Sequence, residues 1–258
     1  MKVVILCGGL GTRLREETEF RPKPLVEIGN RPILWHIMKL YAHYGHRDFV
    51  LCLGYRGNMI KDYFLKYEAM NNDFTIHLGR ESHISFEGSH AEQDFHVTLA
   101  DTGLASMTGG RVKRVQRYLN GQTFMVTYGD GVSDLNLDCL LAFHRSHGRL
   151  ATVTTVLPPS RFGLVDMDED GQIRRFTEKP QGDAFASAGF FVFEPGVFDY
   201  LDGDDCILEG RPLERLAAAG HLMAYRHDGF FHPMDTYREH QYLNQLWESG
   251  RPPWKVWQ

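Results

Sequence analysis

The sequence predicts an α/β fold, a Rossmann-like three-layer sandwich with a mostly parallel mixed sheet. Strands are predicted at residues 3–7, 49–53, 74–78, 96–100, 124–128 and 151–157, and the first of these, apolar throughout, has the composition of a strand buried on both faces. Segments with apolar residues at helical spacing separate several of them: residues 33–44, 57–67, 111–119 and 137–147. Strands that alternate with helices form βαβ units, and the helices of such units cover a parallel sheet.

The chain has a shorter rhythm after residue 157. Strand-like runs follow one another with little helix between them: residues 163–167, 173–178 and 188–193. They predict a smaller antiparallel addition that receives a second substrate. Residues 79–94 are polar and show no period, so we expect an irregular excursion there. The C-terminal tail contains Trp254 and Trp257, which would pack either on the chain's own body or on a sister subunit.

Composition excludes several classes of protein. The net charge is −5, which argues against a general nucleic-acid binder or a protein of anionic membrane surfaces. The longest apolar runs are too short to span a bilayer. The four cysteines are widely spaced, with no C-x-x-C, so we expect free thiols and a cytoplasmic location. No H-E-x-x-H occurs among the thirteen histidines, which argues against zinc.

The first strand leads directly into a loop rich in glycine, Gly8-Gly9-Leu10-Gly11. Glycines allow a positive φ and the close approach of a ligand, and successive backbone N–H groups form an anion site. Arg13 adds a guanidinium suited to phosphate, and Lys23 follows between two prolines that stiffen its segment. Glycines alone are also compatible with a simple tight turn. The two added cations favour a site for a polyphosphate.

Two aspartates are candidates for binding a metal ion. Asp130 lies between two glycines directly after the strand at 124–128, and Asp235 precedes a predicted helix. A turn residue and a helix cap are the alternative interpretations. Next to a phosphate site, the two carboxylates suggest Mg²⁺, which takes one or two carboxylates and fills its other positions with phosphate oxygens and water.

Several stretches resemble the sugar-1-phosphate nucleotidyltransferase family: Leu6-Cys7-Gly8-Gly9-Leu10-Gly11-Thr12-Arg13-Leu14 and Arg21-Pro22-Lys23-Pro24. Others narrow the resemblance to its glucose-1-phosphate cytidylyltransferase branch: Pro32-Ile33-Leu34-Trp35-His36-Ile37-Met38, Thr108-Gly109-Gly110-Arg111, Tyr128-Gly129-Asp130-Gly131 and Pro233-Met234-Asp235-Thr236. The similarity runs nearly from end to end. It implies a transferase that makes CDP-glucose and pyrophosphate from CTP and α-D-glucose 1-phosphate, for dideoxy sugars of the lipopolysaccharide O-antigen. It also implies a homo-oligomer, a hexamer whose neighbouring subunits help complete the sites.

The resemblance also implies roles for individual residues. The nucleotide would lie on Leu6, Cys7, Gly8, Gly9, Leu10, Gly11, Thr12, Arg13, Lys23, Ser106, Arg111 and Gly129. The sugar phosphate would lie on Gly163, Glu178, Lys179 and Ser187, and Mg²⁺ on Asp130 and Asp235. Within the nucleotide set, Arg111 would read the cytosine. The catalytic groups would be Arg13, Lys23, Asp130 and Lys179.

One domain is expected over residues 1–258, with the nucleotide-binding part at about 1–157 and the sugar-phosphate-binding and C-terminal part at about 158–258. Ser187-Ala188-Gly189 departs from the Asn-Gly-Gly that the family tends to have, so another sugar 1-phosphate is an alternative to glucose. UTP or dTTP is an alternative to CTP. A non-catalytic nucleotide sensor would have little need for the cations and carboxylates together. An NAD oxidoreductase would need an acidic residue after the first long helix, whereas Glu27 precedes it.

Overall fold

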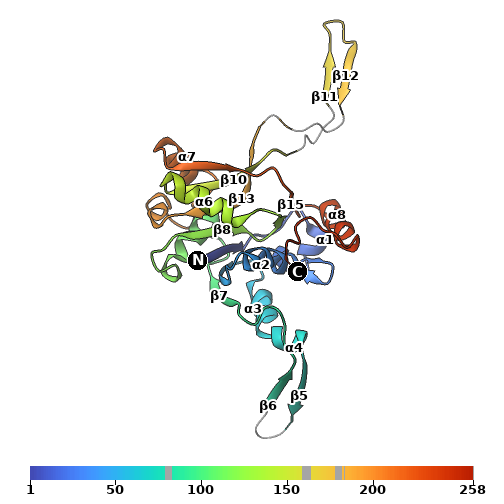
Figure 1. Ribbon diagram of the computed structural model, residues 1–258, viewed down its shortest axis with the longest axis vertical. Coiled ribbons are helices and arrows are strands. Elements are labelled where there is room, and N and C mark those ends of the chain that lie inside the picture. The colour runs from blue at the N-terminus through green and yellow to red at the C-terminus, as the bar shows by residue number, and fades with distance from the viewer. Residues whose placement is uncertain (79–82, 159–163, 178–181, 183, 258) are drawn as a thin grey trace.

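The computed structural model of the protein describes residues 1–78, 83–158, 164–177, 182 and 184–257 (Figure 1). Seven strands form the central sheet in the order β14-β10-β13-β8-β1-β4-β7. Their bounds are β1 (Lys2–Cys7), β4 (Asp48–Leu53), β7 (His96–Asp101), β8 (Phe124–Tyr128), β10 (Ala151–Val156), β13 (Ala186–Phe193) and β14 (Leu222–Arg226). Only β13 runs antiparallel to its neighbours among these strands. The predicted mostly parallel mixed sheet is confirmed.

Two strands of the second half of the chain were assigned wrongly or missed. The run at 188–193 was predicted within the antiparallel addition, but as β13 it lies in the centre of the main sheet, between β10 and β8. Its last six residues are all buried, as expected for a strand covered on both faces. Strand β14 was not predicted, because it is a partly exposed edge strand and its residues Leu222, Met223 and Ala224 favour helices over strands.

Helices cover both faces of the sheet. One core layer contains residues of α2 (Ile33–His43), α6 (Leu137–His147) and α8 (Tyr237–Glu248), and the other contains residues of α5 (Thr108–Arg114) and α7 (Arg211–Ala218). Along β1, Val3 and Ile5 face the first layer while Val4 and Leu6 face the second. This alternation explains why the strand is apolar throughout.

Two predicted helices have different bounds in the structure. The segment at 57–67 is divided into α3 (Gly57–Leu65) and α4 (Tyr67–Asn71), because Lys66 leaves the helical conformation. The segment at 111–119 begins earlier, as α5, and ends in the 3-10 turn η2 (Gln116–Tyr118). The remaining short elements are α1 (Arg15–Thr18), η1 (Lys23–Leu25), β2 (Glu27–Ile28), β3 (Arg31–Pro32), β9 (Gly131–Ser133), η3 (Pro195–Tyr200) and β15 (Phe231–Pro233). None of the helices within the described part of the chain is long and apolar enough to cross a membrane.

Two antiparallel hairpins extend from opposite ends of the body (Figure 1). One consists of β11 (Leu164–Met167) and β12 (Ile173–Thr177) and corresponds to the predicted antiparallel addition. The other consists of β5 (Asp73–His77) and β6 (His83–Glu87). Strand β6 lies within the stretch predicted to be irregular, so that prediction was wrong there. Its five residues are exposed and alternate between polar and apolar, a short strand signal inside a polar stretch that sequence reasoning overlooked, and the strand pairs with β5.

The aromatic C-terminal tail packs on the chain's own body. Trp254 and Trp257 are both buried in the core layer that contains α2. The indole N–H of Trp254 donates to Nδ1 of the buried His36 at 3.3 Å, and Nε2 of His36 lies 3.0 Å from the Ile28 carbonyl. Burial lowers the pKa of His36 to about 4, because the charged ring would lose its hydration. The tail is therefore anchored on a neutral imidazole.

Candidate active site

The site begins where two adjacent parallel strands end. Strands β1 and β8 pair with Leu6 opposite Tyr128, and the N–H of Gly129 donates to the Leu6 carbonyl at 3.1 Å. The glycine loop that follows β1 and the Gly129-Asp130 turn that follows β8 therefore lie at the same edge of the sheet. In open α/β sheets this edge is where ligands bind.

A cleft of about 330 Å³ opens at this edge, a size suited to a small-molecule ligand. Predicted residues that line it are Leu6, Cys7, Gly8, Gly9, Gly11, Thr12, Arg13, Lys23, Ser106, Arg111, Gly129 and Asp130. The side chain of Leu10, which was predicted with them, is exposed to solvent. The cleft thus gathers residues from the loop after β1, the start of α5 and the end of β8.

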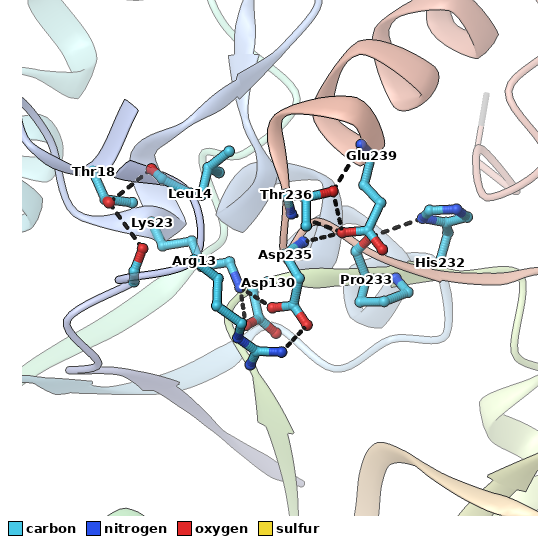
Figure 2. Close-up of polar contacts among 11 residues, drawn as sticks. Arg13, Leu14, Thr18, Lys23, Asp130, His232, Pro233, Asp235, Thr236 and Glu239 are labelled. Carbon is cyan, nitrogen blue, oxygen red and sulfur yellow. Dashed lines mark hydrogen bonds and ion pairs between the residues drawn. The ribbon is translucent and has the colours of Figure 1, made fainter. Parts of the chain in front are cut away.

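A short two-stranded ladder brings Asp235 to Asp130. Strands β9 and β15 are antiparallel, with Pro233 opposite Gly131, and the N–H of Met234 donates to the Asp130 carbonyl at 2.8 Å. Asp235 follows at once and its side chain turns toward Asp130 (Figure 2).

Asp235 does not cap the helix that follows. Thr236 is the N-cap of α8, and its hydroxyl accepts from the N–H of Glu239 at 3.3 Å. The Glu239 carboxylate accepts from the backbone N–H groups of Thr236 and Asp235, at 2.7 and 2.8 Å. This capping box fixes the backbone of Asp235 and leaves its carboxylate directed at Lys23 and Arg13.

Lys23 joins the two aspartates. Its ammonium lies 2.7 Å from Oδ2 of Asp130 and 2.5 Å from Oδ1 of Asp235 (Figure 2). The other oxygen of Asp235, Oδ2, lies 2.7 Å from Nη1 of Arg13. Lys23 is largely buried, whereas the Arg13 side chain is 71% exposed, so Arg13 remains free to reorient toward a ligand. Two cations and two carboxylates, from three distant segments, form one charged cluster.

The two carboxylates fit a divalent cation of the Mg²⁺ type. They converge on a single point that Lys23 now contacts, and Mg²⁺ requires only one or two carboxylates when phosphate oxygens complete its shell. No group of three or more acidic, histidine or cysteine side chains in the described ranges could hold a metal by itself. A metal here would therefore depend on a phosphate ligand.

Arg111 lies beneath the glycine loop, with its donors directed at protein acceptors. The guanidinium donates to carbonyls of Gly8, Leu53, Gly103 and Leu104 and to the Thr102 hydroxyl, over 2.8 to 3.3 Å. A Cβ on Gly8 would overlap the guanidinium, which explains why that position lacks a side chain. Burial lowers the pKa of Arg111. Arg111 thus ties four chain segments together at the back of the cleft.

Cys7 and Ser106 are both buried and both line the cleft. Burial raises the pKa of the Cys7 thiol well above its usual value, because the thiolate would be poorly solvated. Cys7 therefore acts as a small apolar side chain next to the ligand space.

A second cavity of about 360 Å³ adjoins the cluster and contains the only predicted sugar-phosphate residue within the described ranges, Ser187. The Ser187 hydroxyl accepts from the N–H of Gly189 at 3.2 Å. Arg13, Asp130 and Asp235 also line this cavity. Gly163, Glu178 and Lys179 lie outside the residues that the structure describes.

Sequence reasoning missed further residues that line the cleft: Pro24, Met107, Thr108, Tyr128, Ile207 and Glu209. Pro24, Thr108 and Tyr128 stand within the stretches that carry the resemblance and could have been found there. Ile207 and Glu209 belong to a loop without a periodic pattern, so the sequence carries no signal for them.

Comparison with known proteins agrees with this architecture. The family model described as nucleotidyl transferase matches residues 2–219. The chain belongs to the nucleotidyl transferase family and is an enzyme of that class.

Curated relatives place it further within the family. It is 51% identical to glucose-1-phosphate cytidylyltransferase of Salmonella typhi, with both chains covered completely. It is 43% identical, again over both full chains, to a protein of Bacillus subtilis named probable glucose-1-phosphate cytidylyltransferase. Among solved structures, HddC from Yersinia pseudotuberculosis in complex with GMP-PN has a TM-score of 0.70 at 22% identity, covering 95% of this chain and 99% of its own. That last likeness concerns the fold.

Proposed function

We propose that the protein transfers a cytidylyl group from CTP to α-D-glucose 1-phosphate, giving CDP-glucose and pyrophosphate. The observation that carries the proposal is the cluster of Lys23, Asp130 and Asp235 at the end of the glycine loop. A binding protein for nucleotides has little use for two carboxylates facing a triphosphate. A phosphoryl-transfer site needs them to hold the metal ion that neutralises charge. The full-length relatives supply the choice of base and sugar.

The charges of the cluster suit a displacement at the α-phosphate. A sugar phosphate has its second pKa near ~6, so the attacking oxygens are ionised at neutral pH and need no general base. The protein then has to align two anionic reactants and neutralise their repulsion. Lys23 would move from the carboxylates to the α-phosphate, and the exposed Arg13 would hold the leaving phosphates. Ser106, Arg111 and Gly129 belong to the proposed nucleotide site. Arg111 would form part of its wall, because its guanidinium already donates to five protein acceptors, and cytosine reading by Arg111 stays a prediction of the resemblance. Asp130 and Asp235 would hold Mg²⁺, which supplies charge neutralisation when bound.

Sugar-phosphate binding is assigned to Gly163, Glu178, Lys179 and Ser187, with Lys179 completing the catalytic set of Arg13, Lys23 and Asp130. The cavity beside Ser187 supports this assignment, because Arg13, Asp130 and Asp235 of the charged cluster also line it. The nucleotide-binding and sugar-phosphate-binding parts, at about 1–157 and 158–258, would work as one domain.

The proposal extends to a homohexamer in the cytoplasm that supplies dideoxy-sugar synthesis for the O-antigen. All four cysteines are free thiols, which supports a reducing compartment. In light scattering, the hexamer predicts a mass about six times the 29.6 kDa of one chain. A mass of one chain at working concentration contradicts this part of the proposal.

Pyrophosphate release tests the reaction directly. The assay combines CTP, UTP, dTTP or GTP with glucose 1-phosphate or another hexose 1-phosphate, in the presence of Mg²⁺. We expect CTP with glucose 1-phosphate to give the highest kcat/KM. A preference for UTP or dTTP, or for another sugar, contradicts the assignment of substrates. If the protein binds nucleotide but releases pyrophosphate with no combination of nucleotide and sugar phosphate, the proposed reaction is contradicted.

A further inference from the structure

The loop at residues 202–210 forms part of the wall of the cleft, although it is distant in sequence from the glycine loop. It packs against the start of α5. The N–H of Met107 donates to the Asp204 carbonyl at 2.8 Å, and the N–H of Gly110 donates to the Cys206 carbonyl at 3.1 Å. Arg114 holds the Asp204 carboxylate through two hydrogen bonds, at 2.7 and 2.5 Å.

Gly109 and Gly110 make this close contact possible. A Cβ on Gly109 would lie 2.6 Å from Sγ of Cys206, and a Cβ on Gly110 would lie 2.6 Å from the Asp204 carbonyl oxygen. Both distances are too short for real side chains. The two glycines of the Thr-Gly-Gly-Arg stretch therefore serve to seat the loop against the cleft.

Glu209 belongs to this loop, and its side chain lines the cleft. Leu208 is completely buried and anchors the loop, while the exposed residues on either side of it, Ile207 and Glu209, line the cleft. The Thr108 hydroxyl donates to Oε2 of Glu209 at 2.6 Å and accepts from the N–H of Leu208 at 2.9 Å. Thr108 thus fixes both the backbone next to Glu209 and its carboxylate.

Charge limits what the Glu209 carboxylate can bind. It would repel the phosphates of a nucleotide, so it must face hydrogen-bond donors. Within the described residues its only hydrogen bond comes from Thr108, and Oε1 accepts none from them. Glu209 lines the nucleotide cleft and also the second cavity, together with Arg13 and Asp130. It therefore lies near the phosphate end of the cleft, where the donors that a nucleotide offers are the two hydroxyls of its ribose.

We propose that Glu209, positioned by Thr108, binds the ribose hydroxyl pair of the nucleotide and selects ribonucleotides over deoxynucleotides. The inference rests on the proposed function only in requiring a nucleoside triphosphate in the cleft. It is independent of the base and of the transfer step.

Binding measurements test it without turnover. Calorimetry without sugar phosphate compares CTP with 2′-deoxy-CTP and 3′-deoxy-CTP, and UTP with 2′-deoxy-UTP. Hydrogen bonds to a charged group predict a roughly 10- to 100-fold preference for the ribonucleotide in the unaltered protein. Glu209→Ala should weaken CTP binding by about that factor and leave the deoxy analogues within about threefold, so that the preference disappears. Glu209→Gln should retain part of it, and Thr108→Val should reduce it.

Glu214→Ala is the matched control, because Glu214 is an exposed glutamate on the neighbouring helix α7. It should leave both the binding and the preference unchanged. A Glu209→Ala protein that binds every nucleotide more weakly but keeps the full ribose preference overturns the inference. So does a loss confined to the KM for glucose 1-phosphate, which would assign Glu209 to the hexose. Binding with a preference that depends on Glu209, but without pyrophosphate release, supports the inference and contradicts the proposed function.

Discussion

Lys23 and Arg111 were both predicted to contact the nucleotide, yet they lie in contrasting surroundings. Lys23 pairs with two carboxylates that a divalent cation could equally satisfy, so its partners are exchangeable. Arg111 is bonded to four backbone carbonyls and a hydroxyl, which no ion replaces. We infer that a buried cation is available to a ligand when its partners are charged groups in a cleft. It serves the fold when its partners are carbonyls of several segments.

The largest effect is expected at the exchangeable cluster. Asp130→Asn removes a charge that Lys23 contacts and that the proposed metal ion would need, and should lower kcat by on the order of 10² or more. Its melting temperature should change little, because the cluster is partly exposed and Lys23 keeps Asp235 as a partner. Steady-state kinetics and thermal unfolding are measured on the same sample. Near-normal turnover removes Asp130 from the reaction.

Arg111 should behave in the opposite way. In Arg111→Lys the ammonium cannot replace a planar guanidinium that donates to five acceptors. Several buried carbonyls therefore lose their hydrogen-bond donors. We expect a loss of stability on the order of 3 kcal/mol, measured by denaturant unfolding. Activity per folded molecule and the ratio of CTP to UTP use are measured in parallel. A stable variant with a changed CTP to UTP ratio favours direct cytosine reading and breaks the contrast with Lys23.

His36 extends the comparison to a buried group that no ligand reaches. Its folded pKa of about 4 lies below the value of about 6.5 expected when unfolded, so the unfolded chain binds the extra proton first. This contribution to stability is present above pH 6.5 and is lost as the pH falls toward 4. It amounts to about 3 kcal/mol. Unfolding free energies across this range, with and without His36→Gln, measure it. If the unfolding free energy of the two proteins depends on pH in the same way, the lowered pKa of His36 is contradicted.

The smallest effect concerns Cys7. Its buried thiol with a raised pKa should react with iodoacetamide far more slowly than the exposed Cys139 in the folded protein. Mass spectrometry of partially labelled protein gives both rates. Rapid labelling of Cys7 would show that the protein opens around the glycine loop. It would contradict the rigidity that the hydrogen bonds of Arg111 predict for this region.

The fold was readable because its signals are local and strong. In the central sheet β1, β4 and β8 are almost entirely apolar, β7 and β10 combine apolar residues with threonine, and α6 was predicted with its observed bounds. β14 was missed because Leu222, Met223 and Ala224 are better helix formers than strand formers. β6 was missed because its alternation covers only five residues inside a polar stretch.

The sequence singled out individual residues of the candidate site, but not how these residues lie relative to one another. Asp130 and Asp235 could be singled out, but β9 and β15 are too short to show a period that would predict their meeting. The burial of Arg111 runs against the usual exposure of arginine, so its partners could not be foreseen. The capping box of Thr236 and Glu239, in contrast, is legible in the sequence.

We propose that Asp130 and Asp235 hold one divalent cation together while Lys23 turns to the nucleotide. A crystal structure with Mn²⁺ and a non-hydrolysable CTP analogue tests it most directly. We predict one anomalous peak within coordination distance of an oxygen from each aspartate and from the triphosphate, with the Lys23 ammonium on a phosphate oxygen. Mn²⁺ bound elsewhere, with Lys23 still between the two carboxylates, would contradict the account.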